Sequence, residues 1–157
     1  MVRHVVSVDV ALTWDELRHA GYIGIDRHVR NIARSRPAVY GADYNAWHIH
    51  VLGAWGECAI AQATERYWCD RTTPDGGAPD VGDLHVRTTQ HRDGSLILHP
   101  EDRDAGAYVL VVLLALPRFR IVGWTTGAEG KQETYWRTDV RTPAYFVPPS
   151  ALHPWPR

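Results

Sequence analysis

Apolar residues recur every three or four positions in the first part of the chain, which is the spacing of an amphipathic helix. Thr13 and Glu16 stand three residues apart where this pattern begins, as in the capping box that starts many helices. The apolar positions that follow are Trp14, Leu17, Ile25, Val29 and Ile32. The pattern predicts a helix over residues 14–35.

A second stretch, residues 46–68, is also typical of a helix, and its centre is rich in glycine and alanine. Glycine inside a helix costs about 1 kcal/mol relative to alanine, so Gly53 and Gly56 indicate that another element packs closely against this helix. Glu57 lies one turn after Gly53, and we expect its carboxylate to enter the narrow space that the missing side chain leaves.

Strand patterns follow in the second half of the chain. Residues 84–89 (LHVRTT) alternate in polarity, which places His85 and Arg87 on the same face of a strand. The Asp-Gly pair at 93–94 predicts a hairpin that leads into a further strand at residues 95–99.

The continuous apolar run at residues 107–116 is typical of a central strand that is covered on both faces. Residues 118–124 predict its antiparallel partner, and residues 144–148 predict a short strand that ends at the following prolines. With the two helices, these strands predict one α/β domain over residues 1–157. We expect a central mixed, largely antiparallel sheet flanked by helices.

Composition and charge narrow the classes of function. The chain has 157 residues, of which 45% are apolar and 22% charged, as in an ordinary globular domain. The net charge of −1 gives no strong basic footprint for nucleic acid and leaves room only for a local basic patch. The single apolar run is about half as long as a membrane helix needs, so we expect no membrane partner.

The two cysteines, Cys58 and Cys69, stand eleven residues apart, without the close pairs of a zinc knuckle. Two thiols in a chain of this size, together with an N-terminus that lacks an apolar signal segment, predict a location in the reducing cytoplasm.

Residues 78–91 (APDVGDLHVRTTQH) carry the candidate chemistry. Asp80 precedes the predicted strand, His85 lies within it, and Glu57 comes from the helix that we expect to pack beside it. Magnesium prefers carboxylate oxygens and water, whereas an imidazole ligand shifts the preference towards manganese. Such an ion produces hydroxide and neutralises charge on a phosphate during cleavage. These residues therefore predict a divalent metal site, with Mg²⁺ or Mn²⁺ as cofactor. The alternative is a turn aspartate followed by an ordinary half-exposed strand.

This constellation resembles the PD-(D/E)XK, or restriction-endonuclease-like, superfamily of nucleases. Pro79-Asp80 occupies the place of the PD element, and His85-Val86-Arg87 occupies the place of (D/E)XK. Glu57 looks like the acid on the first core helix of that family. The resemblance extends from the first predicted helix to the end of the chain, which is also similar to small phage and bacterial proteins.

The resemblance implies a restriction-endonuclease-like fold and a divalent-metal-dependent deoxyribonuclease, with DNA rather than RNA as its substrate. The implied metal ligands are Glu57, Asp80, His85 and the carbonyl of Val86. The implied catalytic residues are Glu57, Asp80, His85 and Arg87.

Two positions depart from the family pattern. His85 stands where the family has an acid, and Arg87 stands where it has lysine. Arginine stays charged and cannot act as a base, although it can bind a phosphate and stabilise negative charge. Lys131, the one lysine of the chain, and Arg92 are the further candidates for contact with nucleic acid.

Two alternatives to a nuclease stay open. The first is a DNA-binding relative that kept the fold and lost the chemistry, which the substitutions at His85 and Arg87 favour. The second is a phage-related protein-interaction module. A homodimer is compatible with each of these interpretations.

Overall fold

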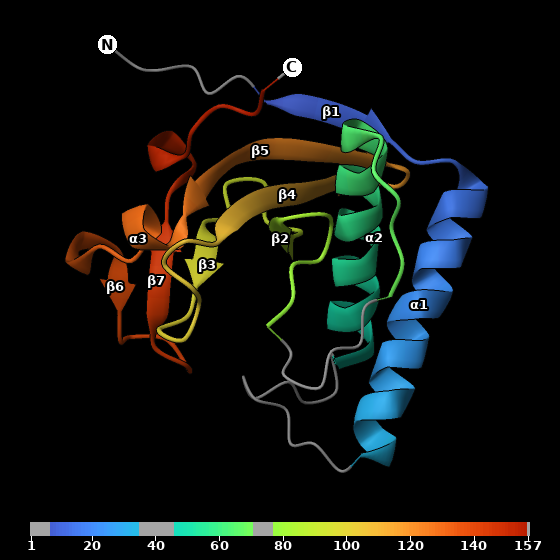
Figure 1. Cartoon of the computed structure of the whole chain (residues 1–157), viewed down its shortest axis with the longest axis horizontal. Helices are drawn as coiled ribbons and strands as arrows, with labels where there is room; N and C mark the ends of the chain where they lie inside the picture. The colour runs from blue at the N-terminus through green and yellow to red at the C-terminus, as the bar shows by residue number, and fades with distance from the viewer. Residues whose placement is uncertain (1–6, 35–45, 71–76, 157) are drawn as a thin grey trace.

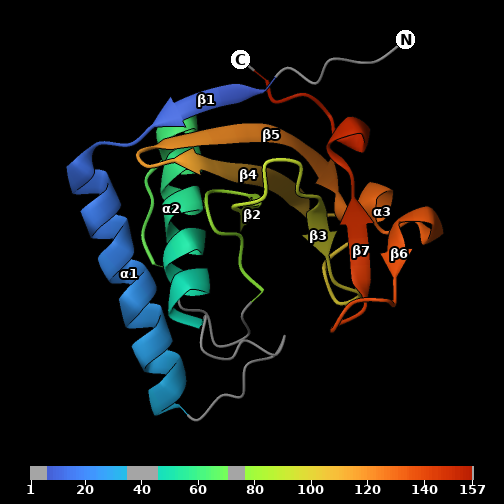
Figure 2. The ribbon, with the colours of Figure 1, turned by 180° about the vertical axis from the view of Figure 1, so that it is seen from behind.

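The computed structural model of the protein describes residues 7–34, 46–70 and 77–156. The architecture is mixed α/β, as the sequence predicts, and consists of three layers (Figure 1). Helices α1 (Trp14–Ala33) and α2 (Ala46–Thr64) lie beside one another on one face of a four-stranded sheet. A second, three-stranded sheet lies across the other face (Figure 2). The long helices of the described part therefore cover one face rather than both, which corrects the expected flanking arrangement.

The four-stranded sheet has the order β1-β5-β4-β2. Strand β4 pairs antiparallel with β5 and parallel with β2, and β5 pairs antiparallel with β1, so the sheet is mixed and largely antiparallel as predicted. Strand β2 forms one edge. The strands are β1 (Val8–Ala11), β5 (Arg118–Thr126), β4 (Ala107–Ala115) and β2 (Leu84–Thr89).

The smaller sheet has the order β3-β7-β6, and its strands pair antiparallel. They are β3 (Leu96–Leu98), β7 (Ala144–Val147) and β6 (Trp136–Arg137). Three short helices complete the second half of the chain, namely α3 (Gly127–Gly130), η1 (Glu133–Tyr135) and η2 (Pro149–Ala151).

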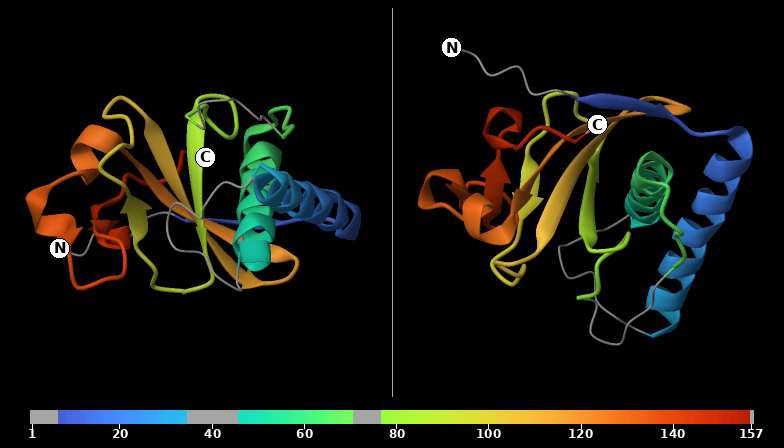
Figure 3. Two further views of the ribbon diagram at one scale, coloured as in Figure 1. Left: turned by 90° about the horizontal axis from the view of Figure 1, so that it is seen from below. Right: turned by 45° about the horizontal axis from the view of Figure 1, so that its top comes forward.

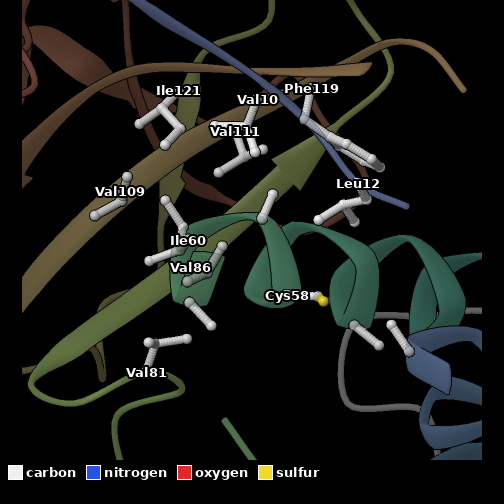
Figure 4. Packing of buried hydrophobic residues seen from close by; sticks show 14 of the residues in the cluster. Val10, Leu12, Cys58, Ile60, Val81, Val86, Val109, Val111, Phe119 and Ile121 are labelled. Atoms are coloured by element: carbon white, nitrogen blue, oxygen red, sulfur yellow. The ribbon is translucent and has the colours of Figure 1, made fainter. Parts of the chain in front are cut away.

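Strand β4 is covered on both faces, which confirms the interpretation of its apolar run. Val109 and Val111 pack into the core beneath the helices, where they meet Ile60 of α2 (Figure 4). Tyr108 and Leu110 point the other way and pack into a second core between the two sheets. The smaller sheet forms the second cover. No helix in residues 7–34, 46–70 and 77–156 is long and apolar enough to cross a membrane.

Local hydrogen bonds set the start of α1 and the end of α2. The Oγ1 of Thr13 accepts a hydrogen bond from the Glu16 N–H at 3.1 Å, and the Glu16 carboxylate accepts one from the Thr13 N–H at 2.7 Å, which confirms the capping box. Helix α2 ends at Thr64, four residues before the expected end. Glu65 adopts a φ of +52°, and the N–H of Arg66 donates to the carbonyl of Ala61, as in a Schellman motif.

The hairpin expected at residues 93–94 is wrong. The N–H of Gly94 donates to the carbonyl of His91, which closes a turn, but β2 and β3 enter different sheets. The physical reason is the direction in which their apolar residues point. Val86 of β2 belongs to the core beneath the helices, whereas Leu96 of β3 belongs to the core between the sheets.

Close approach between α2 and β2 occurs at Gly56 rather than at Gly53. A Cβ at Gly56 would overlap the Oγ1 of Thr88, whereas a Cβ at Gly53 would meet no atom within 4 Å. The absent side chain of Gly56 therefore allows the helix to lie directly on the edge strand, and Gly53 is not needed for packing.

This difference gives a matched pair of substitutions. We expect Gly56→Ala to lower the free energy of unfolding by about 1–3 kcal/mol, because the added methyl group forces α2 away from Thr88. Gly53→Ala should instead raise it by up to about 1 kcal/mol, through helix propensity alone. Chemical denaturation of both variants measures the two effects. Equal stability of the two variants would contradict the packing described.

Candidate functional site

Asp80 lies along the outer edge of β2. Its Oδ2 accepts a hydrogen bond from the Val86 N–H at 2.7 Å, and its own N–H donates to the carbonyl of Leu84 at 2.8 Å. The N–H and carbonyl of one strand residue point the same way, so the Val86 carbonyl faces this edge too. Burial, followed by the negative charge of Glu57, raises the pKa of Asp80 to about 6. The Val86 N–H bond and the nearby arginines act in the opposite direction.

Asp80, His85 and Arg87 line one small cavity of about 150 Å³, which we call the acid cavity. It therefore brings together three of the four expected catalytic residues. The His85 ring stacks on Tyr108, with 4.8 Å between the ring centroids and 16° between the planes. Burial, followed by the positive charge of Arg87, lowers the pKa of His85 and so favours its neutral imidazole. The other lining residues are Gly77, Ala78, Glu101, Asp102, Arg103 and Tyr108.

Arg87 is already bound within this cavity. Its Nη2 donates to both carboxylate oxygens of Asp102, at 3.0 and 3.1 Å, and its Nε donates to the carbonyl of Ile97 at 3.3 Å. The guanidinium also lies 5.2 Å from the centre of the Tyr108 ring, a distance at which a cation and a ring attract. Its orientation is thus fixed, and Asp102 offsets part of its charge.

Glu57 is buried, with only 5% of its surface exposed, but it is bound on the side of α1. Arg27 donates to its two oxygens at 2.7 and 2.6 Å, and the indole N–H of Trp68 donates to the second oxygen at 3.0 Å. Glu57 is not among the described residues that line the acid cavity. Its charge nevertheless contributes to the raised pKa of Asp80.

A network of arginines and aspartates surrounds this pair. The Nε of Arg27 donates to Asp70 at 2.6 Å, and Arg30 forms ion pairs with both Asp26, at 2.8 Å, and Asp70. The network ties α1 to the segment that follows α2. Sequence reasoning missed Arg27 and Asp70, because nothing in their spacing identifies Glu57 as a partner.

The placed residues do not fit the expected metal site. Within the described part of the chain, no three histidine, cysteine, aspartate or glutamate side chains form a group that could hold a metal ion. Arg27 occupies both oxygens of Glu57, and Arg87 occupies both oxygens of Asp102. Of the side chains expected to bind the metal, Asp80 and His85 are the two that line the same cavity. A guanidinium thus balances Glu57 at the position where the family pattern leads us to expect a cation.

A second and larger cavity, of about 820 Å³, lies between the two sheets, and we call it the basic groove. Arg87, Arg92 and Arg141 line it together with one acid, Asp93. Its other lining residues are Thr88, Thr89, His91, Gly94, Ser95, Ile97, His99, Leu110, Val140, Thr142, Ala144 and Phe146. Arg87 belongs to both cavities, so the groove opens beside Asp80 and His85.

The two further candidates for contact with nucleic acid therefore lie in different places. Arg92 is exposed and lines the basic groove. Lys131 instead holds the loop between β3 and β4, where its Nζ donates to the Asp102 carbonyl at 2.6 Å and pairs with Asp104 at 2.6 Å. Lys131 is not among the described residues that line either cavity. It fixes the loop that carries Asp102, and through Asp102 it supports the orientation of Arg87.

No protein-family model, curated protein or solved structure matches this chain. The functional interpretation consequently rests on the geometry of the acid cavity and the basic groove.

The bound state of Glu57 leads to a first expected outcome for the site. Glu57→Gln should lower the free energy of unfolding by about 1–3 kcal/mol, because it removes one of the two carboxylates that pair with the mostly buried Arg27 and leaves Asp70 as the other. Asp9→Asn, which breaks the exposed pair with Arg120, is the control and should cost less than about 1 kcal/mol. If Glu57→Gln instead raised the free energy of unfolding, the charge of Glu57 would not be neutralised by the protein, as in a metal site without its ion.

The raised pKa of Asp80 leads to a second expected outcome. The folded protein binds this proton more tightly than the unfolded chain does, so ionisation of Asp80 removes stability as the pH rises from about 4 to about 6. Asp80→Asn lacks this ionisation and keeps an oxygen that can accept from Val86. Its unfolding free energy should therefore gain about 2 kcal/mol relative to the parent protein across that range.

Urea denaturation of both proteins at several pH values gives this difference directly. The other carboxyl groups are the same in the two proteins, so their contributions to the pH dependence cancel in the difference. A difference that stays constant between pH 4 and 7 would mean that Asp80 ionises in the folded protein as it does in water.

Proposed function

We propose that this protein binds nucleic acid, DNA rather than RNA, through phosphate contacts in the basic groove. One observation carries the proposal. In a chain with a net charge of −1, three arginines line one groove of about 820 Å³ together with one acid, Asp93, while Asp102 pairs with Arg87 from outside the lining. Phosphate contacts supply most of the affinity of non-specific binding to nucleic acid, and arginine matches phosphate with a planar, two-pronged donor.

The groove also offers neutral donors beside its arginines. Thr89 and Ser95, which carry hydroxyl groups, are among its lining residues, and hydroxyls commonly donate to phosphate oxygens. Most of the lining surface of the groove is apolar, in part from Ile97 and Phe146, and a sugar or base can pack against it. The combination is that of a surface for a phosphodiester backbone rather than for a simple anion.

A metal-dependent deoxyribonuclease of the PD-(D/E)XK type is the second candidate function, with Mg²⁺ or Mn²⁺ as cofactor. The observation that favours it is the junction of the two cavities at Arg87. A phosphate held by Arg87 from the groove would lie next to the buried carboxyl group of Asp80 and the neutral imidazole of His85. The pairing of Glu57 with Arg27 supports the binding function, because the guanidinium already neutralises the carboxylate that a metal ion would need as a ligand.

A cytoplasmic location belongs to the same proposal. It is supported by the state of the two cysteines, since Cys58 is a free thiol in the core and Cys69 is a free, half-buried thiol. Unpaired thiols are typical of a reducing compartment, where DNA would also be accessible.

Binding can be tested with fluorescently labelled single-stranded and duplex DNA, and with RNA of the same sequence, in excess chelator at two salt concentrations. We expect Arg92→Ala to weaken DNA binding about tenfold and to reduce the salt dependence by about one counterion. Arg118→Ala removes the same charge from an exposed position outside the groove and serves as the control. Equal losses in both variants, or no binding by the parent protein, would contradict the proposal.

Cleavage is then measured on the same substrates with Mg²⁺, Mn²⁺ or chelator. In the binding function, the parent protein leaves the DNA intact in all three conditions. If the second candidate is correct, cleavage is faster with Mn²⁺ because of the imidazole of His85, and Asp80→Ala abolishes it without unfolding the domain. Metal-dependent cleavage by the Asp80→Ala protein would exclude Asp80 from the chemistry.

A further inference from the structure

Helix α1 presents an apolar stripe to solvent. The side of the helix that faces α2 and the core carries Leu17, Ala20 and Gly24, which are buried. A different side carries large apolar residues that remain exposed, namely Trp14 (69%), Tyr22 (64%), Ile25 (42%), Val29 (48%) and Ile32 (58%). We call these five residues the α1 stripe.

The spacing of the α1 stripe is that of a helix-pairing seam. Tyr22, Ile25, Val29 and Ile32 follow one another at intervals of three, four and three residues, which is the a/d spacing of a coiled coil. Trp14 lies on the same side of the helix beyond the exposed Arg18, so the stripe spans residues 14–32, or about 27 Å of helix. Isolated exposed apolar residues are normal on a protein surface, but four in helix-pairing register are typical of a contact surface.

The size of the stripe suits a protein partner. From their exposed fractions, the five side chains present roughly 550 Å² of apolar surface. A standard interface buries about 800 Å² on each partner, including its polar rim. The stripe would therefore supply about two thirds of that area, and the polar residues beside it would have to supply the rest.

We propose that α1 forms the interface of a homodimer, in which the α1 stripe packs antiparallel against the same stripe of a second copy. A two-fold interface uses the same surface on both copies, so that surface must complement itself. An a/d seam on a single helix is self-complementary in this sense. The helix dipoles favour the antiparallel arrangement, because the positive N-terminal end of one α1 then lies beside the negative C-terminal end of the other.

This interface is independent of the proposed nucleic-acid function. Helix α1 lies on the far side of α2 from the sheets, whereas the basic groove is lined by residues of β2, β3 and β7 (Figure 3). Dimerisation through α1 would leave both grooves open, so one particle would carry two of them. Loss of the dimer need not abolish phosphate contacts within a single groove.

The test is the mass of the purified protein in solution, measured by light scattering and by sedimentation over a range of concentrations. We expect a dimer in the parent protein, and an increase of at least about 100-fold in the dissociation constant of the Ile25→Glu, Val29→Glu double variant. Tyr67→Glu places one such charge on a large exposed side chain outside α1 and should leave the dimer intact. Thermal melts show whether each variant is folded.

Three results would overturn the proposal. The first is a parent protein that stays monomeric up to about 100 µM, a concentration at which even weak protein contacts are populated. The second is a dimer that persists in the folded double variant, since another surface would then form it. The third is a dimer that Tyr67→Glu disrupts as strongly as the double variant does. If the double variant fails to fold, Ile25→Ser and Val29→Ser take its place with the same expected direction.

Discussion

The buried carboxylate of Glu57 is the constraint on which the arrangement of the helices depends. A charge with 5% exposure is stable only if a partner of opposite charge and further hydrogen bonds replace water. Arg27 of α1 supplies the charge, and Trp68, just beyond α2, supplies another donor. Three segments thus meet at one side chain. The Schellman motif that ends α2 at Thr64 is what turns the chain back and allows Trp68 to reach Glu57.

The same burial shapes the acid cavity. Gly56 lets α2 lie on β2 beside Thr88, which brings Glu57 close enough to Asp80 for the two charges to interact. Arg27 neutralises Glu57, and the Val86 N–H supports Asp80, so each acid is stabilised by a different group. Glu57 and Asp80 are two carboxylates of the type that binds a metal ion. The groups that bind them in this structure, however, are the Arg27 guanidinium and the Val86 N–H. Neither acid is therefore left without a hydrogen-bond donor from the protein.

The second sheet creates the space in which the basic groove lies. Because β3 leaves the first sheet and pairs with β7, a space opens between the edge strand β2 and the smaller sheet, and the basic groove occupies it. Residues from both sheets, and from the loops between them, gather there around Arg87. Arg87 is held by Asp102, and Lys131 holds the loop that carries Asp102, so the junction of the two cavities is rigid at its charged centre.

The sequence by itself determined the elements that depend on near neighbours or on simple burial. The capping box at Thr13 and the double-faced burial of β4 are of this kind, and so is the placement of His85 and Arg87 in one cavity, since alternate strand residues share a face. Only the tertiary structure decided that β3 joins a second sheet and that Glu57 binds Arg27, 30 residues earlier in the chain. No local pattern identifies a partner at that separation, because side chains so far apart in sequence meet only when the helices pack.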